Sequence, residues 1–217
     1  AEQVAFEEKL EALGIFDLSG YGPSESAFHQ KLEQARWEID GFHLARTRKI
    51  PNLDEPCGAH FTYRQLIECG ETQANSHIPN LPKEPDTYTA LYELSTKLLD
   101  PIIEYFGMIK LTYGFCSPAL AKIIPGRIAP ALDQHASHEI NNRGRLICDR
   151  LGAAVDFVVE HEDMLEVAEW IAKSLPFDRL YYYANDRPLH ISFGANNKGE
   201  FVEMRQHGNH LIPHKRT

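Results

Sequence analysis

The chain has 217 residues, 43% of them hydrophobic, which is enough to bury one good core with an attached helical subdomain. Acidic residues outnumber basic ones by 31 to 22, and the net charge is -9. No basic excess exists to displace counterions from a polyanion, so we expect no nucleic-acid partner and no membrane partner. The four cysteines form no C-x-x-C pair, which favours reduced thiols. We expect a cytoplasmic protein as the sequence stands. The chain starts at Ala1, which is compatible with its being part of a larger protein, and excision from a longer precursor would leave the compartment open.

The N-terminal quarter of the chain has helical periodicity. Apolar residues recur at helical spacing over residues 4–13 and about 24–42. The stretch from Arg46 to Cys57 contains two prolines and is typical of a linker. The sequence therefore predicts a helical N-terminal arm and linker over residues 1–56, followed by the main domain over residues 57–217.

A long helix is the clearest element of the main domain. A short helix is expected first, over residues 61–67. The long helix is then expected to begin with Asp86 as its N-cap and to end at Gly107. Its apolar face comprises Leu91, Leu94, Leu98, Ile102 and Phe106. Pro101 is expected to kink the helix or to divide it in two.

Beyond Gly107 the hydrophobic pattern changes to that of strands. Strands are expected over residues 109–113, 153–159, 179–183, 189–193 and 201–204. A helix over residues 163–174 separates the second strand from the third, and a turn at residues 196–199 predicts that the last two strands form a hairpin. Residues 206–214 carry three histidines and are expected to be a flexible terminus. This order of elements indicates an α+β fold with a mainly antiparallel sheet.

Two ionisable residues lie on these apolar strands. Asp156 belongs to the apolar run at residues 152–157, and His190 belongs to the run at residues 188–193. An ionisable group on a buried strand costs free energy unless it is paired or coordinated. The two residue types together favour a metal, and a metal favours hydrolysis. A hydrogen-bonded core histidine and an unrelated aspartate at a strand end are the alternative.

Nine short motifs in chain order resemble those of the zinc D-Ala-D-Ala carboxypeptidases of the M15 family. They are Phe61-Thr62-Tyr63-Arg64-Gln65-Leu66, Leu99-Asp100-Pro101, Phe106-Gly107, Ser117-Pro118-Ala119-Leu120, Gln134-His135, Gly152-x-Ala154-x-Asp156, Phe177-Asp178, His190-Ile191-Ser192-Phe193 and Asn197-Lys198-Gly199. The resemblance covers about residues 57–205. It implies the fold shared by these enzymes and the hedgehog signalling domain, in which helices lie on one side of a mainly antiparallel sheet.

The resemblance also implies three zinc ligands. The family's metal motif is similar to His-x-x-Gly-x-Ala-x-Asp, followed later by a histidine on a strand, and Asp156 and His190 match its second and third ligands. Strict spacing places Asp149 at the first ligand. An insertion over residues 136–151 makes His135 the better match, with His138 as a competitor.

The residues that the family uses around its metal are changed in this chain. The family's arginine in a Tyr-Arg-Ser-Pro stretch is replaced by Cys116. The family's acid/base carboxylate lies a few residues before the last histidine; here Asp186 is one position away from it and Arg187 occupies it. We expect Asp186 to move the proton and Arg187 to supply the missing positive charge. Alternatively, the two residues have no catalytic role and lie in a solvated turn, with Asp186 paired with Arg187. Glu139, inside the insertion, is a further candidate for the carboxylate that folds back over the metal.

The resemblance implies a zinc-dependent hydrolase in which a water activated by the metal attacks a peptide or amide bond. The expected ligands are His135, Asp156 and His190, and the expected substrate is a small peptide or amide. Two alternatives remain. One is a catalytically inactive, metal-containing binding module, and the other is an intracellular metal-dependent enzyme whose substrate is not peptidoglycan.

Overall fold

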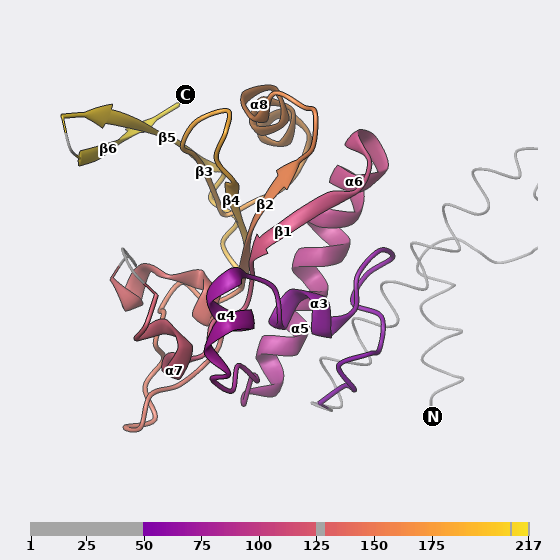
Figure 1. Ribbon diagram of the computed structural model, residues 1–217, viewed down its shortest axis with the longest axis vertical. Coiled ribbons are helices and arrows are strands. Elements are labelled where there is room, and N and C mark those ends of the chain that lie inside the picture. The colour runs from indigo at the N-terminus through magenta and orange to yellow at the C-terminus, as the bar shows by residue number, and fades with distance from the viewer. Residues whose placement is uncertain (1–49, 125–128, 209, 217) are drawn as a thin grey trace, which may run out of the picture. The chain divides into compact units, whose positions relative to one another are not determined.

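The computed structural model describes residues 50–124, 129–208 and 210–216 of the chain (Figure 1). The helices expected over residues 4–13 and 24–42 lie outside the described residues. From Ile50 onward the chain forms one compact unit. Among the described helices, none is long and apolar enough to cross a bilayer.

A six-stranded sheet forms the centre of this unit. Its strands are β1 (Ile109–Tyr113), β2 (Ala153–Val159), β3 (Arg179–Tyr182), β4 (Leu189–Phe193), β5 (Glu200–His207) and β6 (His210–Lys215). The strands lie in the order β1-β2-β4-β3-β5-β6, and each neighbouring pair is antiparallel except β3 and β5. The prediction of an α+β fold with a mainly antiparallel sheet is confirmed.

The long helix has three consecutive parts. These are α5 (Pro85–Leu94), a π-helical turn η1 (Ser95–Leu99) and α6 (Asp100–Phe106), and Gly107 ends the last of them. Pro101 lacks an N–H and its ring would clash with the carbonyl four residues earlier, so the wider π turn before it accommodates the proline. The expected N-cap was wrong: Glu84 is the N-cap and Asp86 lies in the first turn.

Helix α8 (Met164–Ser174) has Asp163 as its N-cap, and the Asp163 side chain accepts a hydrogen bond from the Leu165 amide. The remaining helices are short. They are α3 (Tyr63–Ile67), α4 (Glu71–Ser76), α7 (Pro118–Ala121) and the 3-10 turns η2 (Pro130–Leu132) and η3 (Gln134–Ala136). Thr62 and Gln65 form a capping box at the start of α3, which explains why a helix begins there.

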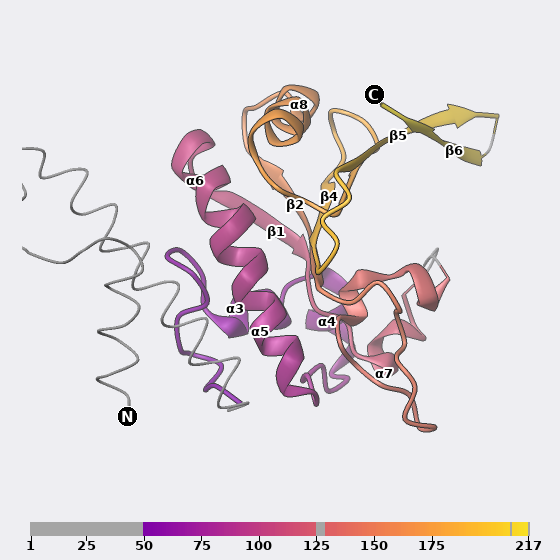
Figure 2. The ribbon, with the colours of Figure 1, turned by 180° about the vertical axis from the view of Figure 1, so that it is seen from behind.

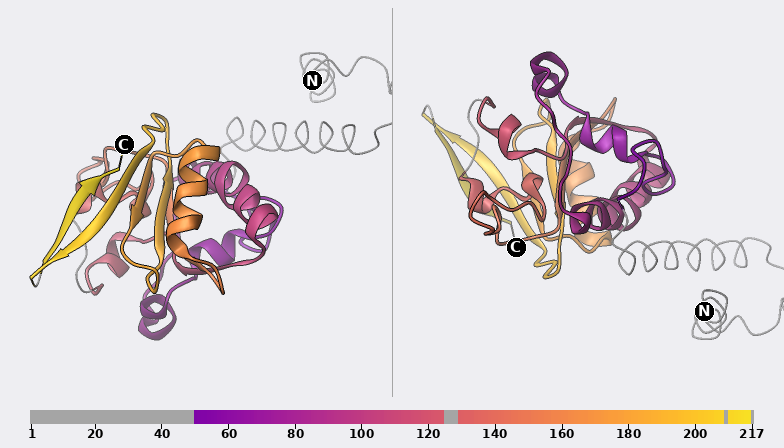
Figure 3. Two further views of the ribbon diagram at one scale, coloured as in Figure 1. Left: turned by 90° about the horizontal axis from the view of Figure 1, so that it is seen from above. Right: turned by 90° about the horizontal axis from the view of Figure 1, so that it is seen from below.

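The two faces of the sheet have different coverings. Side chains alternate along a strand, so Val155 and Phe157 of β2 point away from Asp156. Both are fully buried, and α5 and α8 pack against β2. Figure 3 shows these helices on one side of the strands and the segment from α7 to the start of β2 on the other. Asp156 and His190 therefore face that irregular segment.

Two expectations about the C-terminal part were wrong. The strands β4 and β5 form no hairpin, because β4 already pairs with β2 and β3, and β5 adds to the outer edge of β3 in parallel. The stretch over residues 206–214 is not a free terminus, because most of it belongs to the β5–β6 hairpin. Figures 1 and 2 both show this hairpin projecting from the sheet, and β6 is exposed along its whole length.

Candidate metal centre

The sheet register places two of the expected ligands directly opposite each other. Asp156 of β2 pairs with His190 of β4, and cross-strand partners in a sheet share a face. Tyr181 of β3 pairs with His190 on its other side. The third expected ligand, His135, lies in η3, which contacts β2. Residues separated by 21 and 34 positions in the chain thus meet on one face of the sheet.

The ligand atoms of these three residues converge closely. His135 Nε2 lies 3.2 Å from His190 Nδ1 and 3.3 Å from Asp156 Oδ1, and His190 Nδ1 lies 2.8 Å from Asp156 Oδ1. Tetrahedral zinc with bonds of about 2.0–2.1 Å separates its ligand atoms by about 3.3 Å. The buried cluster could therefore hold one metal ion.

The orientation of the His135 ring is determined by the protein backbone. Its Nδ1 lies 2.8 Å from the carbonyl oxygen of Gly114, and a carbonyl can only accept a hydrogen bond. Nδ1 therefore donates, and the lone pair of Nε2 points at the cluster, as in many metal-binding histidines. The Cys116 amide also donates to the His135 carbonyl at 2.9 Å. Both contacts hold η3 against the segment after β1.

The electrostatics of the cluster favour a bound cation. Burial disfavours a charged Asp156, but the imidazoles of His135 and His190 more than offset this and hold its pKa below the ordinary value. Burial lowers the pKa of His135. The Asp156 carboxylate and weaker neighbouring groups together raise the pKa by more than burial lowers it, so the net shift is upward. The side chain of Asp156 is 29% exposed and that of His190 is 11% exposed, so the cluster is open to solvent on one side.

The competing first ligands lie outside the cluster. Asp149 is exposed in the turn that precedes Leu151. The Nε2 of His138 accepts a hydrogen bond at 3.3 Å from the amide of Gly152, the residue that follows the insertion over residues 136–151. His135, rather than Asp149 or His138, completes the cluster with Asp156 and His190.

Glu139 does not fold back over the cluster. Its Oε1 accepts hydrogen bonds from the Lys83 and Glu84 amides and from Thr87 Oγ1, at 3.0–3.1 Å. The side chain is 2% exposed, and Glu84, the N-cap of α5, makes no side-chain capping bond of its own. A carboxylate from the insertion therefore caps the start of α5, where the helix dipole favours negative charge.

Glu139→Gln is expected to destabilise the protein. The substitution keeps the side-chain size and an accepting oxygen but removes the negative charge that strengthens these three hydrogen bonds and interacts with the helix dipole, so the free energy of unfolding should fall by about 1–2 kcal/mol. Denaturant unfolding of the full chain measures the change. Glu160→Gln, at an exposed position, is the matched control and should change little. An equal loss in both variants would show that Glu139 contributes no cap.

Asp186 and Arg187 lie in the exposed turn between β3 and β4. The Arg187 amide donates to the Ala184 carbonyl within this turn. Neither side chain belongs to the cluster of three ligands described above. Their expected catalytic roles stay predictions.

Two tyrosines, Tyr181 and Tyr183, lie near the cluster. The Tyr181 ring lies 5.3 Å from the His190 ring. Burial, followed by the nearby charge of Asp156, raises the pKa of Tyr183 to about 12, so its phenol stays protonated beside the cluster. The run Tyr181-Tyr182-Tyr183 on the strand next to His190 is the sequence feature that could have indicated aromatic side chains beside the site. Cys116, at the position of the family's arginine, is fully buried.

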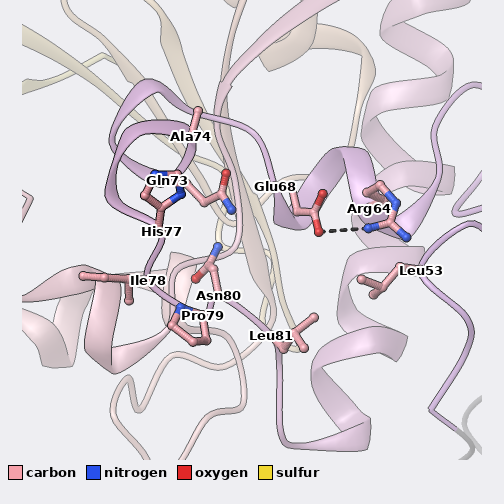
Figure 4. Close-up of a pocket in the computed structure, with 10 residues that line it drawn as sticks. All are labelled: Leu53, Arg64, Glu68, Gln73, Ala74, His77, Ile78, Pro79, Asn80 and Leu81. Atoms are coloured by element: carbon pink, nitrogen blue, oxygen red, sulfur yellow. Dashed lines mark hydrogen bonds and ion pairs between the residues drawn. The ribbon is translucent and has the colours of Figure 1, made fainter.

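A separate pocket of about 530 Å³ lies beside α3 and α4 (Figure 4). Its walls combine apolar side chains such as Leu81 with Glu68 and Arg64, which form an ion pair. None of the three cluster residues lines it. The pocket is therefore distinct from the candidate metal centre.

No protein-family model, curated protein or solved structure matches this chain.

Proposed function

We propose that the protein is a zinc-dependent hydrolase that cleaves a peptide or amide bond, as the resemblance to the D-Ala-D-Ala carboxypeptidases implies, and that its domain has their fold. One observation carries the proposal. Two imidazole nitrogens and one carboxylate oxygen from three separate segments lie within 3.3 Å of one another. Unrelated side chains rarely converge in this way, because burying them without a partner costs free energy.

The donor set supports zinc. Three nitrogen and oxygen ligands with one open position are typical of catalytic zinc sites, whereas structural sites are closed by four ligands. Zinc held by His135, Asp156 and His190 would supply Lewis acidity, which activates water and polarises a carbonyl. Asp156 has the most exposed side chain of the three, at 29%, so a small peptide or amide would approach the metal from its side.

We assign the remaining roles to Asp186 and Arg187, which precede His190 in the chain, and to Tyr181, which pairs with it. Asp186, four positions before His190, takes a proton from the attacking water and passes it to the leaving amine. Arg187 stabilises negative charge that develops on the carbonyl oxygen, in place of the arginine replaced by Cys116. The substrate approaches against Tyr181, whose ring flanks His190.

A metal-containing binding module without hydrolytic activity is the second candidate. Two observations favour it: Cys116 is buried where the family has an arginine and cannot supply a positive charge, and the Glu139 carboxylate is engaged in hydrogen bonds at the start of α5. Such a module would recognise a small ligand through the open side of the metal centre.

Metal analysis followed by hydrolysis assays of the full chain tests the proposal. We expect one zinc per chain and cleavage of a panel of N-acyl dipeptides and simple amides that stops when a chelator removes the zinc. Bound zinc without cleavage of any panel member would favour the binding module. Cleavage that persists in metal-free protein would contradict the zinc mechanism.

Asp186→Asn is expected to lower kcat by about 100-fold, the lower end of what general acid–base catalysis contributes. Zinc content should not change, because Asp186 is not one of the proposed ligands. The matched control is Asp149→Asn, another exposed aspartate. Equal activity of both variants would remove Asp186 from the mechanism.

A further inference from the structure

We propose that a buried polar network of Gln134, Ser192 and Asp178 positions His135 against the other two metal ligands. These three side chains are called the clamp. They are 1%, 0% and 3% exposed, and they lie next to the cluster without belonging to it. The proposal rests on the metal-binding part of the proposed function, not on hydrolysis.

The clamp has one consistent hydrogen-bond direction. The Arg179 amide donates to Ser192 Oγ at 3.1 Å, and Ser192 Oγ donates to Gln134 Oε1 at 2.9 Å. Gln134 Nε2 then donates to Asp178 Oδ2 at 2.9 Å and to the Leu151 carbonyl at 3.0 Å. A carboxylate and a carbonyl only accept, so the amide of Gln134 fits in this one orientation.

Further contacts fix both ends of the clamp. Asp178 Oδ1 accepts from the Lys198 amide at 3.1 Å, and the Asp178 amide donates to the Ser192 carbonyl. Both oxygens of the buried carboxylate therefore have partners. A fully satisfied buried network rigidifies the elements that it joins.

The clamp joins the same two elements as the ligands do. Gln134 directly precedes His135 in η3, and Ser192 lies two residues after His190 on the same face of β4. The Ser192–Gln134 hydrogen bond and the His135–His190 contact thus link η3 to β4 twice, side by side.

His135 needs such a link more than its two partners do. The backbone ladder of β2 and β4 holds Asp156 and His190 in register. His135 lies instead on a three-residue 3-10 turn, followed by Ser137 with a φ of 49°. A short turn has few hydrogen bonds of its own, so contacts with other segments determine where His135 points, and the clamp adds a link to β4 to the Gly114 and Cys116 contacts after β1.

Zinc affinity and the cobalt spectrum of the full chain test the clamp. Zinc affinity is measured by competition with a chelator, and the absorption bands of bound Co²⁺ report the ligand geometry. We expect Ser192→Ala to weaken zinc binding by about 10-fold, the lower end of the range for losing an outer-shell partner because Ser192 acts on His135 through Gln134, and to alter the cobalt bands. Ser95→Ala is the matched control. Ser95 lies in η1 and is also fully buried, but its hydroxyl contacts Cys57 Sγ and no residue of the clamp.

A rescue experiment separates positioning from general stability. Gln134→Glu places a second carboxylate against Asp178, so zinc affinity and the cobalt bands should change as in Ser192→Ala. Adding Asp178→Asn restores a donor opposite position 134 and should recover part of the affinity and the original bands. A variant that only loosened the fold would not be rescued in this way.

Each outcome distinguishes the clamp from the proposed function. Normal zinc affinity and cobalt bands in Ser192→Ala and Gln134→Glu would overturn the clamp while leaving the metal centre intact. Equal losses in Ser192→Ala and Ser95→Ala would overturn it as well. Zinc binding that depends on the clamp, in a protein that cleaves no amide, would support the clamp and contradict the hydrolase. A wild-type chain that binds no zinc would overturn both.

Discussion

His190→Ala is expected to reduce zinc binding to the full chain far more than any other single change described above. The substitution removes one of three ligand atoms and leaves a cavity beside Asp156, so two ligands from different elements remain. The affinity should fall by more than the roughly 100-fold that loss of an outer-shell partner costs. Metal analysis after dialysis should find no stoichiometric zinc, and hydrolysis, if the wild type shows it, should be lost.

Circular dichroism of the same His190→Ala sample checks that the fold is retained. His207→Ala is the matched control, because His207 is an exposed histidine at the end of β5. It should bind zinc as the wild type does. Wild-type zinc content and affinity in His190→Ala would contradict the proposed ligand set, whatever the activity.

Gly152→Ala is expected to be the most destabilising of the substitutions considered. Gly152 has a φ of +75°, and a Cβ there would lie 2.1 Å from the Phe193 carbonyl oxygen and 2.6 Å from Gly194 Cα. Left-handed backbone costs a non-glycine residue about 1–2 kcal/mol, and the clash with backbone atoms adds to this, so the free energy of unfolding should fall by about 3 kcal/mol or more. Denaturant unfolding measures the loss.

The matched control for this glycine is Gly199→Ala. Gly199 has a φ of +63°, but an added Cβ would meet nothing within 4 Å. Only the backbone strain applies there, so we expect a loss of about 1 kcal/mol. Similar losses at Gly152 and Gly199 would mean that the β2–β4 junction relaxes around the new methyl group.

Elements with a strong local pattern were predicted well. The bounds expected for β1, β2 and β4 are those of the structure, because β-branched and aromatic residues fill these strands and turns bound them. The helix expected over residues 163–174 is α8 with Asp163 as its N-cap, and its inward residues Met164 and Ile171 are buried. In these cases the local preference and the tertiary environment agree.

Strand pairing was predicted less well, because it depends on competition among distant segments. A turn at residues 196–199 made a β4–β5 hairpin locally plausible, but β3 occupies the available edge of β4. β6 was missed because its residues are exposed and because, among the described strands, it pairs with β5 alone. The N-cap of α5 was misassigned for a related reason, since its start is capped by Glu139 from 55 residues along the chain.

The candidate metal centre was likewise predictable from the sequence in part and dependent on the tertiary structure in part. The sequence by itself determined that Asp156 and His190 are ionisable residues on apolar strands, because periodicity and composition are local properties. Only the tertiary structure decided that they face each other across β2 and β4, that His135 joins them in place of Asp149 or His138, and that Glu139 serves α5. Register, and the path of an insertion back to the sheet, arise from packing between segments far apart in the chain, which no local pattern encodes.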